Sequence, residues 1–409
     1  MEKYQGTVEE HKFSFCNGKA EINNDVPGVV FGVDFFDEKR DNNNVCLFGG
    51  AGTGKSSMLG EIAYSYHLHG AQIRVIDCFH QTMHLCKKLG GEVIEINHKA
   101  NISLNPFLLI DDLDKDIWLL KYLIAQMGSP NKFLVDVELD HIESVVRESW
   151  AVNGKLTTIT DIYNALIKKS ATGIFKNSFD EFCINLFKYT LDGKSGSYVH
   201  GTPNIEFYSN FGLVDIDGQH ETIEVRTILS MLVMFKLTKD MCMAPVFQRK
   251  VILVDEYLNL WISLNYKEFI VKIYETANAN NGFFVTSEQR LSDGEGSIGM
   301  TAMVEKSYWL LFLHPRLEDF NHIKKLSAFS NWNSDIETML KSVRFNRGHS
   351  NEIFIKEGKG GYKIVRMLFD EYSKLLLSNH PQDYTDIKTK MDNGLKFADA
   401  VDNIVKDIK

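Results

Sequence analysis

Short apolar runs alternate with stretches of helical periodicity along much of the chain. Residues 45–48 form an apolar run, a glycine cluster follows, and apolar residues then recur at helical spacing from Met58 to Tyr66. Further apolar runs at 73–76 and 93–96 lie on either side of a second helical stretch. Because strands that alternate with helices usually pair in parallel, this pattern predicts an α/β fold with a doubly wound, mostly parallel sheet.

The pattern becomes helical throughout between residues 111 and 195. Few β-branched runs occur there, and apolar residues recur with a period of about 3.6. The helices predicted in this stretch cover 117–127, 135–152, 159–169 and 179–189. Strands resume after a glycine- and serine-rich link, over 211–216, 250–254, 282–286 and 307–313, with a long helix over 223–242. The sequence therefore predicts an all-helical subdomain inserted into one sheet.

These patterns divide the chain into five segments. Residues 1–40 form an N-terminal cover segment with an expected hairpin, 41–110 and 196–370 are the two parts of the core, 111–195 is the all-helical insertion, and 371–409 are C-terminal helices. Toward the end of the chain the pattern predicts a hairpin from 352–356 and 362–369, and helices over 381–391 and 395–405.

The composition is that of an ordinary globular chain. The 409 residues are 44% hydrophobic and 24% charged, which excludes global disorder. The formal net charge of −9 provides no overall basic field, so we expect no direct binding of nucleic acid. No apolar run approaches the roughly 18 residues that span a bilayer. The N-terminus lacks a signal-peptide pattern. The six cysteines are scattered along the chain. These features predict a cytoplasmic protein with reduced thiols.

The glycine cluster carries the strongest chemical signal. It fits G-x-x-x-x-G-K-[ST] and stands between a predicted strand and a predicted helix, as a phosphate-binding loop requires. Glycines let main-chain N–H groups turn toward a phosphate, and the helix that begins near Gly54 adds the positive end of its dipole. We expect Lys55 to reach the β- and γ-phosphates of ATP and Ser56 to bind Mg²⁺. The predicted nucleotide-binding residues are Gly49, Gly50, Ala51, Gly52, Thr53, Gly54, Lys55, Ser56 and Ser57.

A second acidic element follows at 251–256, where four apolar residues end in Asp255 and Glu256. This is a Walker B pattern, and together with the glycine-rich loop it favours hydrolysis over kinase-type transfer. We expect Asp255 to hold Mg²⁺ through water and Glu256 to orient or deprotonate the attacking water. Gln289 follows the next predicted strand and is a candidate sensor of the γ-phosphate. The predicted catalytic set is therefore Glu256, Lys55 and Gln289.

Together and in this order, these motifs resemble the C-terminal ATPase domain of conjugative-transfer and type IV secretion ATPases. The resemblance is to the TraC type of the F-type systems, within the HerA/FtsK-related P-loop superfamily, and it extends over residues 28–407. Besides the nucleotide motifs, it includes the segments 104–107, 211–216 and 289–293. The resemblance implies a RecA-like P-loop NTPase fold, with ATP and Mg²⁺ as ligands.

The same resemblance implies a role and partners. It places the chain in the cytoplasm, peripheral at the cytoplasmic face of the inner membrane, as a motor that powers pilus assembly and substrate export. It implies self-association, as a ring or hexamer or as dimers, and contacts with other secretion components. Family members carry an additional N-terminal domain, so we expect this chain to be a fragment, a split-gene product or a truncated paralogue that depends on another chain for that domain.

Other departures from the family pattern concern catalysis. Members usually have a basic residue shortly before the sensor strand, whereas 276–281 contains none here. The remaining candidate arginines are Arg290, Arg316, Arg344 and Arg347. Glu288 stands where the family usually has threonine, and Tyr257-Leu258 replace the usual Ala-Trp. Because an arginine finger accelerates hydrolysis about 10³–10⁵-fold, its loss would leave nucleotide binding intact and turnover slow.

Two other functions stay open at this stage. The chain could be a nucleotide-binding assembly subunit with weak or no hydrolysis, as the missing basic residue suggests. It could also be a DNA-translocating HerA/FtsK-like ATPase, although the net charge of −9 argues against it.

Overall fold

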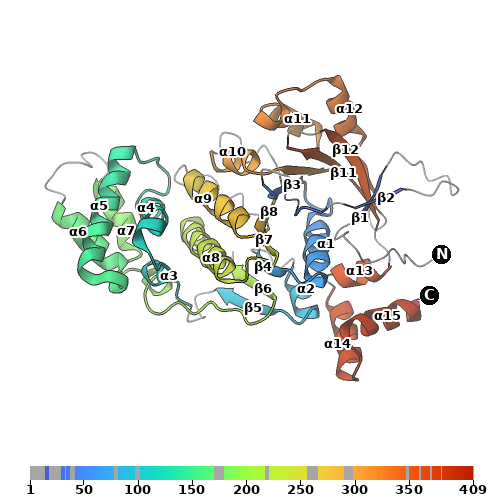
Figure 1. Ribbon diagram of the computed structural model, residues 1–409, viewed down its shortest axis with the longest axis horizontal. Coiled ribbons are helices and arrows are strands. Elements are labelled where there is room, and N and C mark those ends of the chain that lie inside the picture. Colours follow the sequence, from blue (N-terminus) through green and yellow to red (C-terminus); the bar gives the residue numbers. More distant parts are fainter. Residues whose placement is uncertain are drawn as a thin grey trace.

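A 12-stranded sheet runs through the centre of the protein, here a computed structural model (Figure 1). The structure describes residues 14–17, 29–32, 34–36, 42–77, 82–96, 102–169, 179–216, 221–255, 266–289, 298–346, 350–358, 361–368, 371–378 and 380–408. The strands are β1 (Ser14–Asn17), β2 (Val29–Gly32), β3 (Val45–Gly49), β4 (Gln72–Asp77), β5 (Glu92–Ile96), β6 (Phe211–Ile216), β7 (Lys250–Val254), β8 (Gly282–Glu288), β9 (Trp309–Leu313), β10 (Phe345–Asn346), β11 (Ser350–Glu357) and β12 (Tyr362–Leu368).

The helices lie on both faces of this sheet and beyond one end of it (Figure 1). They are α1 (Lys55–Leu68), α2 (Met83–Lys88), α3 (Pro106–Leu109), α4 (Leu113–Gly128), α5 (Asp136–Asn153), α6 (Ile159–Lys169), α7 (Phe179–Phe187), α8 (Ile223–Met243), α9 (Tyr266–Ala279), α10 (Ile298–Glu305), α11 (Phe320–Ile323), α12 (Ser334–Ser342), α13 (Glu371–Leu377), α14 (Pro381–Asp392) and α15 (Phe397–Ile408). In the described part of the chain, no helix has both the length and the apolarity to cross a membrane.

The strand order is β2-β1-β12-β11-β9-β3-β8-β7-β4-β6-β5, with β10 paired to β11. From β9 to β5 all neighbours pair in parallel, which confirms the predicted doubly wound α/β fold. The strands β11, β12, β1 and β2 extend the sheet in antiparallel pairing. The two hairpins, β1–β2 and β11–β12, were expected from the sequence. Their place in this sheet was not, because a strand pattern does not reveal which neighbour the strand pairs with.

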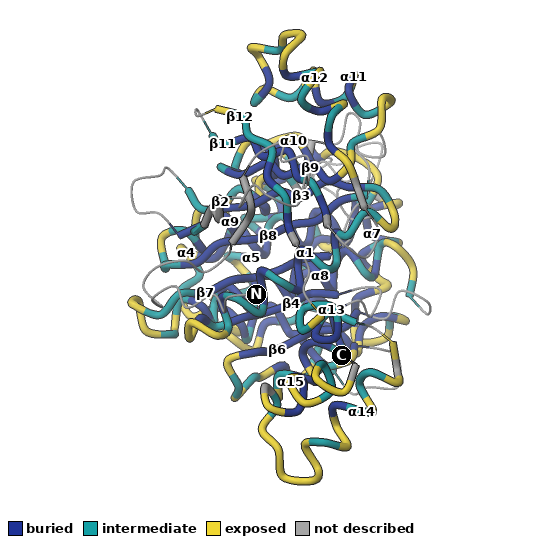
Figure 2. Tube along the Cα trace, turned by 90° about the vertical axis from the view of Figure 1, so that its right-hand side faces the viewer, coloured by how far each residue is buried: buried dark blue, intermediate teal, exposed yellow. Residues whose placement is uncertain are grey.

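Alternation along the strands divides the core into two layers. In β3, Val45 and Leu47 belong to one cluster of buried side chains and Cys46 and Phe48 to the other, because successive side chains point to opposite faces. The first cluster includes residues of α1 and α2, and the second includes residues of α4, α8 and α9. Figure 2 shows the central strands buried along their length.

Helices α4 to α7 lie within the stretch predicted to be an all-helical insertion. α6 has the predicted bounds, and α4 begins four residues earlier than predicted because the Asp112 carboxylate caps it by accepting from the Asp114 N–H at 3.1 Å. α4 contacts α5 and α7 of the insertion and also α8 and α9 of the core, so it joins the two. The segment boundaries given above remain predictions.

Helices α9 to α12 were not predicted. In α9 the buried residues Phe269, Ile270, Ile273, Tyr274 and Ala277 recur at helical spacing, so the signal was present and overlooked. α11 is four residues long, too short for periodicity to reveal it.

A buried lysine fastens the C-terminal helices to the core. Lys88, the last residue of α2, is 2% exposed. Its Nζ donates to the main-chain oxygens of Leu375 and Leu376, both at 3.0 Å, and of Ser378 at 2.7 Å. Burial lowers the pKa of this ammonium to about 8, so the charged form still predominates at neutral pH. A cation there satisfies carbonyl groups that the end of α13 leaves without helical partners.

Replacing this lysine should loosen α13. We expect Lys88→Met to lower the free energy of unfolding by about 2 kcal/mol, because three carbonyl groups near the end of α13 lose a charged donor. Residues 371–378 should also become more sensitive to proteolysis. The matched control is Lys87→Met, since Lys87 is the exposed neighbour on the same helix. Equal urea unfolding midpoints for the two variants would contradict this account of Lys88.

Candidate active site

The loop after β3 has the backbone that a glycine-rich phosphate loop needs. Gly52 and Gly54 have φ angles of 76° and 94°, which glycine adopts without strain. Thr53 closes the loop, because its N–H and its hydroxyl donate to the Gly50 oxygen at 3.2 and 2.8 Å. A Cβ at Gly49 would lie 2.6 Å from Thr53 Oγ1. Side chains at these glycines would therefore disturb the loop, and the predicted phosphate-binding motif has the expected conformation.

Helix α1 begins directly at this loop. Gly54 is its N-cap residue and supplies no side-chain hydrogen bond, and the first turn contains no acidic residue. The first N–H groups of a helix have no partner within it, and the helix dipole favours an anion at this end. Lys55, 4% exposed, and Ser56 and Ser57 lie in the same first turn. The residues at this helix end fit the phosphates of a nucleotide.

A distant strand contacts the loop at the start of α1. Asn351 of β11 is 3% exposed, and its Nδ2 would lie 2.0 Å from a Cβ on Gly54. Gly54 is therefore required both by its φ angle and by lack of space.

The effect of that contact can be measured. Gly54→Ala should lower the free energy of unfolding by about 3 kcal/mol, from backbone strain and overpacking together. The control is Gly70→Ala, at the other end of α1, where φ is 78° and a Cβ would meet nothing within 4 Å; strain alone should cost about 1 kcal/mol there. The measurement is urea unfolding without nucleotide. Equal losses of unfolding free energy in the two variants would show that Asn351 leaves room for a methyl group at position 54.

Asp255 lies just beyond β7, where the Walker B pattern predicts it. The residue is 1% exposed, and its N–H donates to the Ile76 oxygen of β4 at 3.1 Å. The Ser287 hydroxyl of β8 donates to Asp255 Oδ1. A buried carboxylate beside a hydroxyl suits Mg²⁺, which prefers oxygen ligands and bound water. Glu256, the predicted catalytic base, lies outside the described residues.

The strand that leads to Gln289 lies between the loop strand and the strand of Asp255. Phe48 of β3 is in register with Glu288 of β8, so the ends of these two strands are adjacent. Glu288 is fully buried at this position.

Burial, and then the nearby Glu288, raise the pKa of the Cys46 thiol well above its usual value. Cys46 therefore stays protonated and is not a reactive thiolate.

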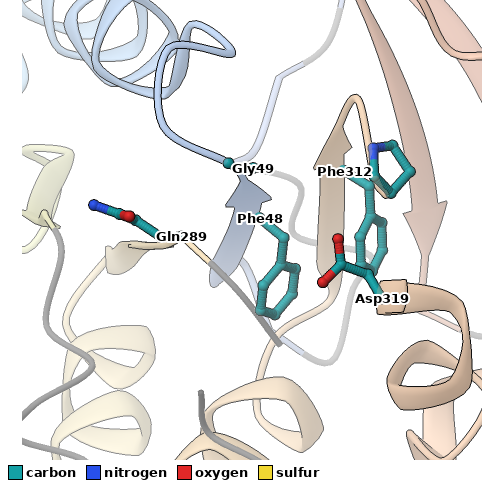
Figure 3. A pocket seen from close by; sticks show the side chains of 7 residues that line it. Phe48, Gly49, Gln289, Phe312 and Asp319 are labelled. Atoms are coloured by element: carbon teal, nitrogen blue, oxygen red, sulfur yellow. The ribbon is translucent and has the colours of Figure 1, made fainter. Parts of the chain in front are cut away.

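A small hollow opens beside the first half of the loop (Figure 3). It is lined by Phe48, Gly49, Gly50, Gln289, Phe312, Pro315 and Asp319. The rings of Phe48 and Phe312 stack there with centroids 5.1 Å apart, and in Figure 3 the Gln289 carboxamide extends away from them. The hollow borders Gly49 and Gly50, the first two residues of the loop.

The asparagine-rich stretch before β8 lies at the opposite edge of the sheet. Asn278 Oδ1 accepts from the N–H of Asn43, two residues before β3 begins, at 3.3 Å. Asn281 Nδ2 donates to the oxygens of Phe247 and Gln248, both at 3.3 Å, just before β7. The family's basic residue would thus lie at the amino ends of these strands, away from the loop of the same chain.

The structure brings most of the predicted site residues to one edge of three adjacent strands. Lys55 and Ser56 follow β3, Gln289 follows β8 and Asp255 follows β7. Sequence reasoning missed the Ser287 contact to Asp255, although a polar residue near the end of an apolar strand was a usable signal. It also missed Asn351. No local signal exists for this residue, because Asn351 lies 297 residues after Gly54 in the chain (351 − 54 = 297).

The fold and the loop geometry define a P-loop NTPase of the α/β class. The profile of the TraG P-loop domain family matches residues 26–408. The chain belongs to the TraG P-loop domain family, which confirms the resemblance to conjugation and type IV secretion ATPases. A comparison with curated proteins gives no significant match.

Solved structures share this fold. VirB4 of Thermoanaerobacter pseudethanolicus matches with a TM-score of 0.69 and 17% identity, over 90% of this chain and 99% of that one. The plasmid coupling protein TrwB in complex with the ATP analogue ADPNP matches with a TM-score of 0.52 and 13% identity, over 80% and 85%. TrwB in complex with ADP and Mg²⁺ matches with a TM-score of 0.52 and 15% identity, over 80% and 84%. The predicted P-loop NTPase fold is therefore confirmed.

Proposed function

We propose that this protein is an ATPase motor subunit of a type IV secretion or conjugative transfer system, which hydrolyses ATP to power pilus assembly and substrate export. The observation that carries the proposal is the arrangement of a glycine-rich phosphate loop after β3 and a buried Asp255 beyond β7, with β8 between them. Membership of the TraG P-loop domain family supplies the biological setting.

The nucleotide would occupy the loop from Gly49 to Ser57, with Lys55 at the β- and γ-phosphates. Ser56 and Asp255 would hold Mg²⁺, whose charge offsets that of the phosphates. The TrwB complexes with ADPNP and with ADP and Mg²⁺ support these ligands for a domain of this fold.

Hydrolysis joins a water oxygen to the γ-phosphorus and breaks its bond to the oxygen that bridges to the β-phosphate. ADP leaves with the electron pair of that bond. Glu256 receives the proton of the attacking water, and Gln289 senses the γ-phosphate from the end of β8.

The proposal extends to partners and place. We infer that the protein is cytoplasmic and peripheral at the cytoplasmic face of the inner membrane, where it contacts other secretion components and a chain that supplies the family's N-terminal domain. It self-associates, as a ring or hexamer or as dimers. The net charge of −9 argues against direct nucleic-acid binding and so against a DNA-translocating role.

A second candidate is a nucleotide-binding assembly subunit that hydrolyses ATP weakly. The specific observation in its favour is the absence of a basic residue from 276–281. A structural nucleotide would still need the P-loop and Asp255, so binding alone does not separate the two functions.

The rate of ATP turnover per subunit, measured over a range of protein concentrations, tests self-association at the site. A rate that rises with concentration would show that neighbouring subunits complete the site. A constant rate, with light scattering that shows no assembly over the same range, would contradict self-association.

A further inference from the structure

Arg316 lies against the phosphate loop of its own chain. A Cβ placed on Gly50 would be 3.4 Å from Arg316 Nη2, 3.7 Å from Nε and 3.8 Å from Cζ. Three atoms of the guanidinium group are thus nearly equidistant from one point of the loop. Nη2 and Nε are nearer to that point than Cζ, so the Nε–Nη2 edge of the guanidinium faces Gly50, which also lines the hollow.

The fold positions this arginine. β9 pairs in parallel with β3, and Leu313 is in register with Gly49, so the turn after β9 emerges beside the loop. Asp319 holds that turn: its Oδ2 accepts from the Arg316 N–H at 2.9 Å, and its own N–H donates to the Arg316 oxygen at 3.0 Å. Pro315 and Asp319 line the hollow together with Gln289, the predicted γ-phosphate sensor.

The guanidinium group is available to a ligand. Among the described residues its side-chain hydrogen bond goes from Nη1 to Glu318 Oε1 at a long 3.4 Å, and both side chains are about half exposed or more, at 48% and 64%. Such an exposed pair is weak. A phosphate binds the planar fork of a guanidinium more strongly, because its oxygens accept two parallel N–H bonds.

We propose that Arg316 binds the terminal phosphate of ATP in cis and stabilises the charge on its oxygens during hydrolysis. It would thereby do, from the turn after β9, what the basic residue absent from 276–281 does in the family. The inference rests on the proposed function, because it concerns the same loop and the same reaction. It places the catalytic charge on the β9 side of the P-loop strand, opposite to β8 and Asp255.

Binding and kinetics of three variants test this role. Arg316→Ala should lower kcat about 10²-fold, the size expected for loss of one donor to developing charge. It should raise the Kd for ATP at least about tenfold. The Kd for ADP should change less than twofold, because ADP lacks the terminal phosphate. The kcat and the ATP affinity of Arg316→Lys should lie between those of wild type and Arg316→Ala, since the point charge of an ammonium replaces the planar guanidinium. Arg147→Ala, which removes a similarly exposed arginine of the insertion, should match wild type.

The outcomes separate this inference from the proposed function. Equal weakening of ATP and ADP by Arg316→Ala, or none, in a wild type that binds Mg·ATP would overturn the inference and leave the proposed function standing. A wild type that binds no Mg·ATP would overturn both. The selective loss of ATP affinity can be measured whether or not turnover is fast, so the test does not depend on robust hydrolysis.

Mixing two variants distinguishes cis from trans action. Lys55→Ala keeps Arg316 but lacks the loop lysine, whereas Arg316→Ala keeps the loop intact. If Arg316 acts in cis, the rate of an equimolar mixture equals the mean of the two separate rates at the same total concentration. A mixture clearly faster than that mean would overturn the cis assignment, because arginine of one chain would then serve the loop of another.

Discussion

Lys55→Ala should weaken Mg·ATP binding at least about 100-fold and remove measurable turnover. Lys55 is 4% exposed in the first turn of α1, directly after the loop. Its loss removes a charge-assisted contact to the β- and γ-phosphates, and such contacts contribute about 1.5–3 kcal/mol each. The measurement is nucleotide titration by calorimetry together with phosphate release.

The control for this prediction is Lys115→Ala, because the Lys115 side chain is 79% exposed on α4 and belongs to the insertion. It should bind and hydrolyse ATP as wild type does. Unchanged ATP affinity in Lys55→Ala would refute the assignment of the loop as the nucleotide site, provided that circular dichroism shows a folded protein.

Glu256→Gln should abolish turnover and leave binding intact. The substitution keeps the size of the side chain but removes the carboxylate that receives the proton of the attacking water, and loss of such a group lowers kcat about 10²–10⁴-fold. The Kd for Mg·ATP should stay within about twofold of wild type, because Lys55 and the loop are unchanged. Glu305→Gln, an exposed glutamate at the end of α10, is the matched control.

Two results would contradict the role of Glu256. Turnover at the wild-type rate would show that another group handles the proton. Loss of ATP binding together with turnover would indicate that Glu256 supports the site structurally and does not act on water.

The sequence could predict those parts of the fold and site that depend on local pattern. The loop motif predicts the positions of Lys55 and Ser56, because it consists of a strand, a glycine turn and a helix in immediate succession. The apolar run before Asp255 likewise predicts where a strand ends. The parallel sheet followed from the alternation of such units. The bounds of the helix over 159–169 could also be predicted, since they depend on a single stretch of helical periodicity.

The rest depended on pairing between distant segments, which periodicity does not encode. Asn351 contacts Gly54, and Arg316 contacts Gly50, only because β11 and β9 join the sheet beside β3. Lys88 similarly lies near α13 through tertiary packing. Arg316 was one of several candidate arginines in the sequence, and only the structure places it beside Gly50.

The central claim, that this P-loop domain hydrolyses ATP, is tested most directly by steady-state phosphate release from purified wild-type protein at saturating ATP, with Mg²⁺ and with EDTA. We predict a kcat of about 1 s⁻¹ or above, at the lower end of the range for working enzymes, which disappears when EDTA removes Mg²⁺. Saturable binding of Mg·ATP without phosphate release above the EDTA background would contradict the claim and favour the assembly subunit.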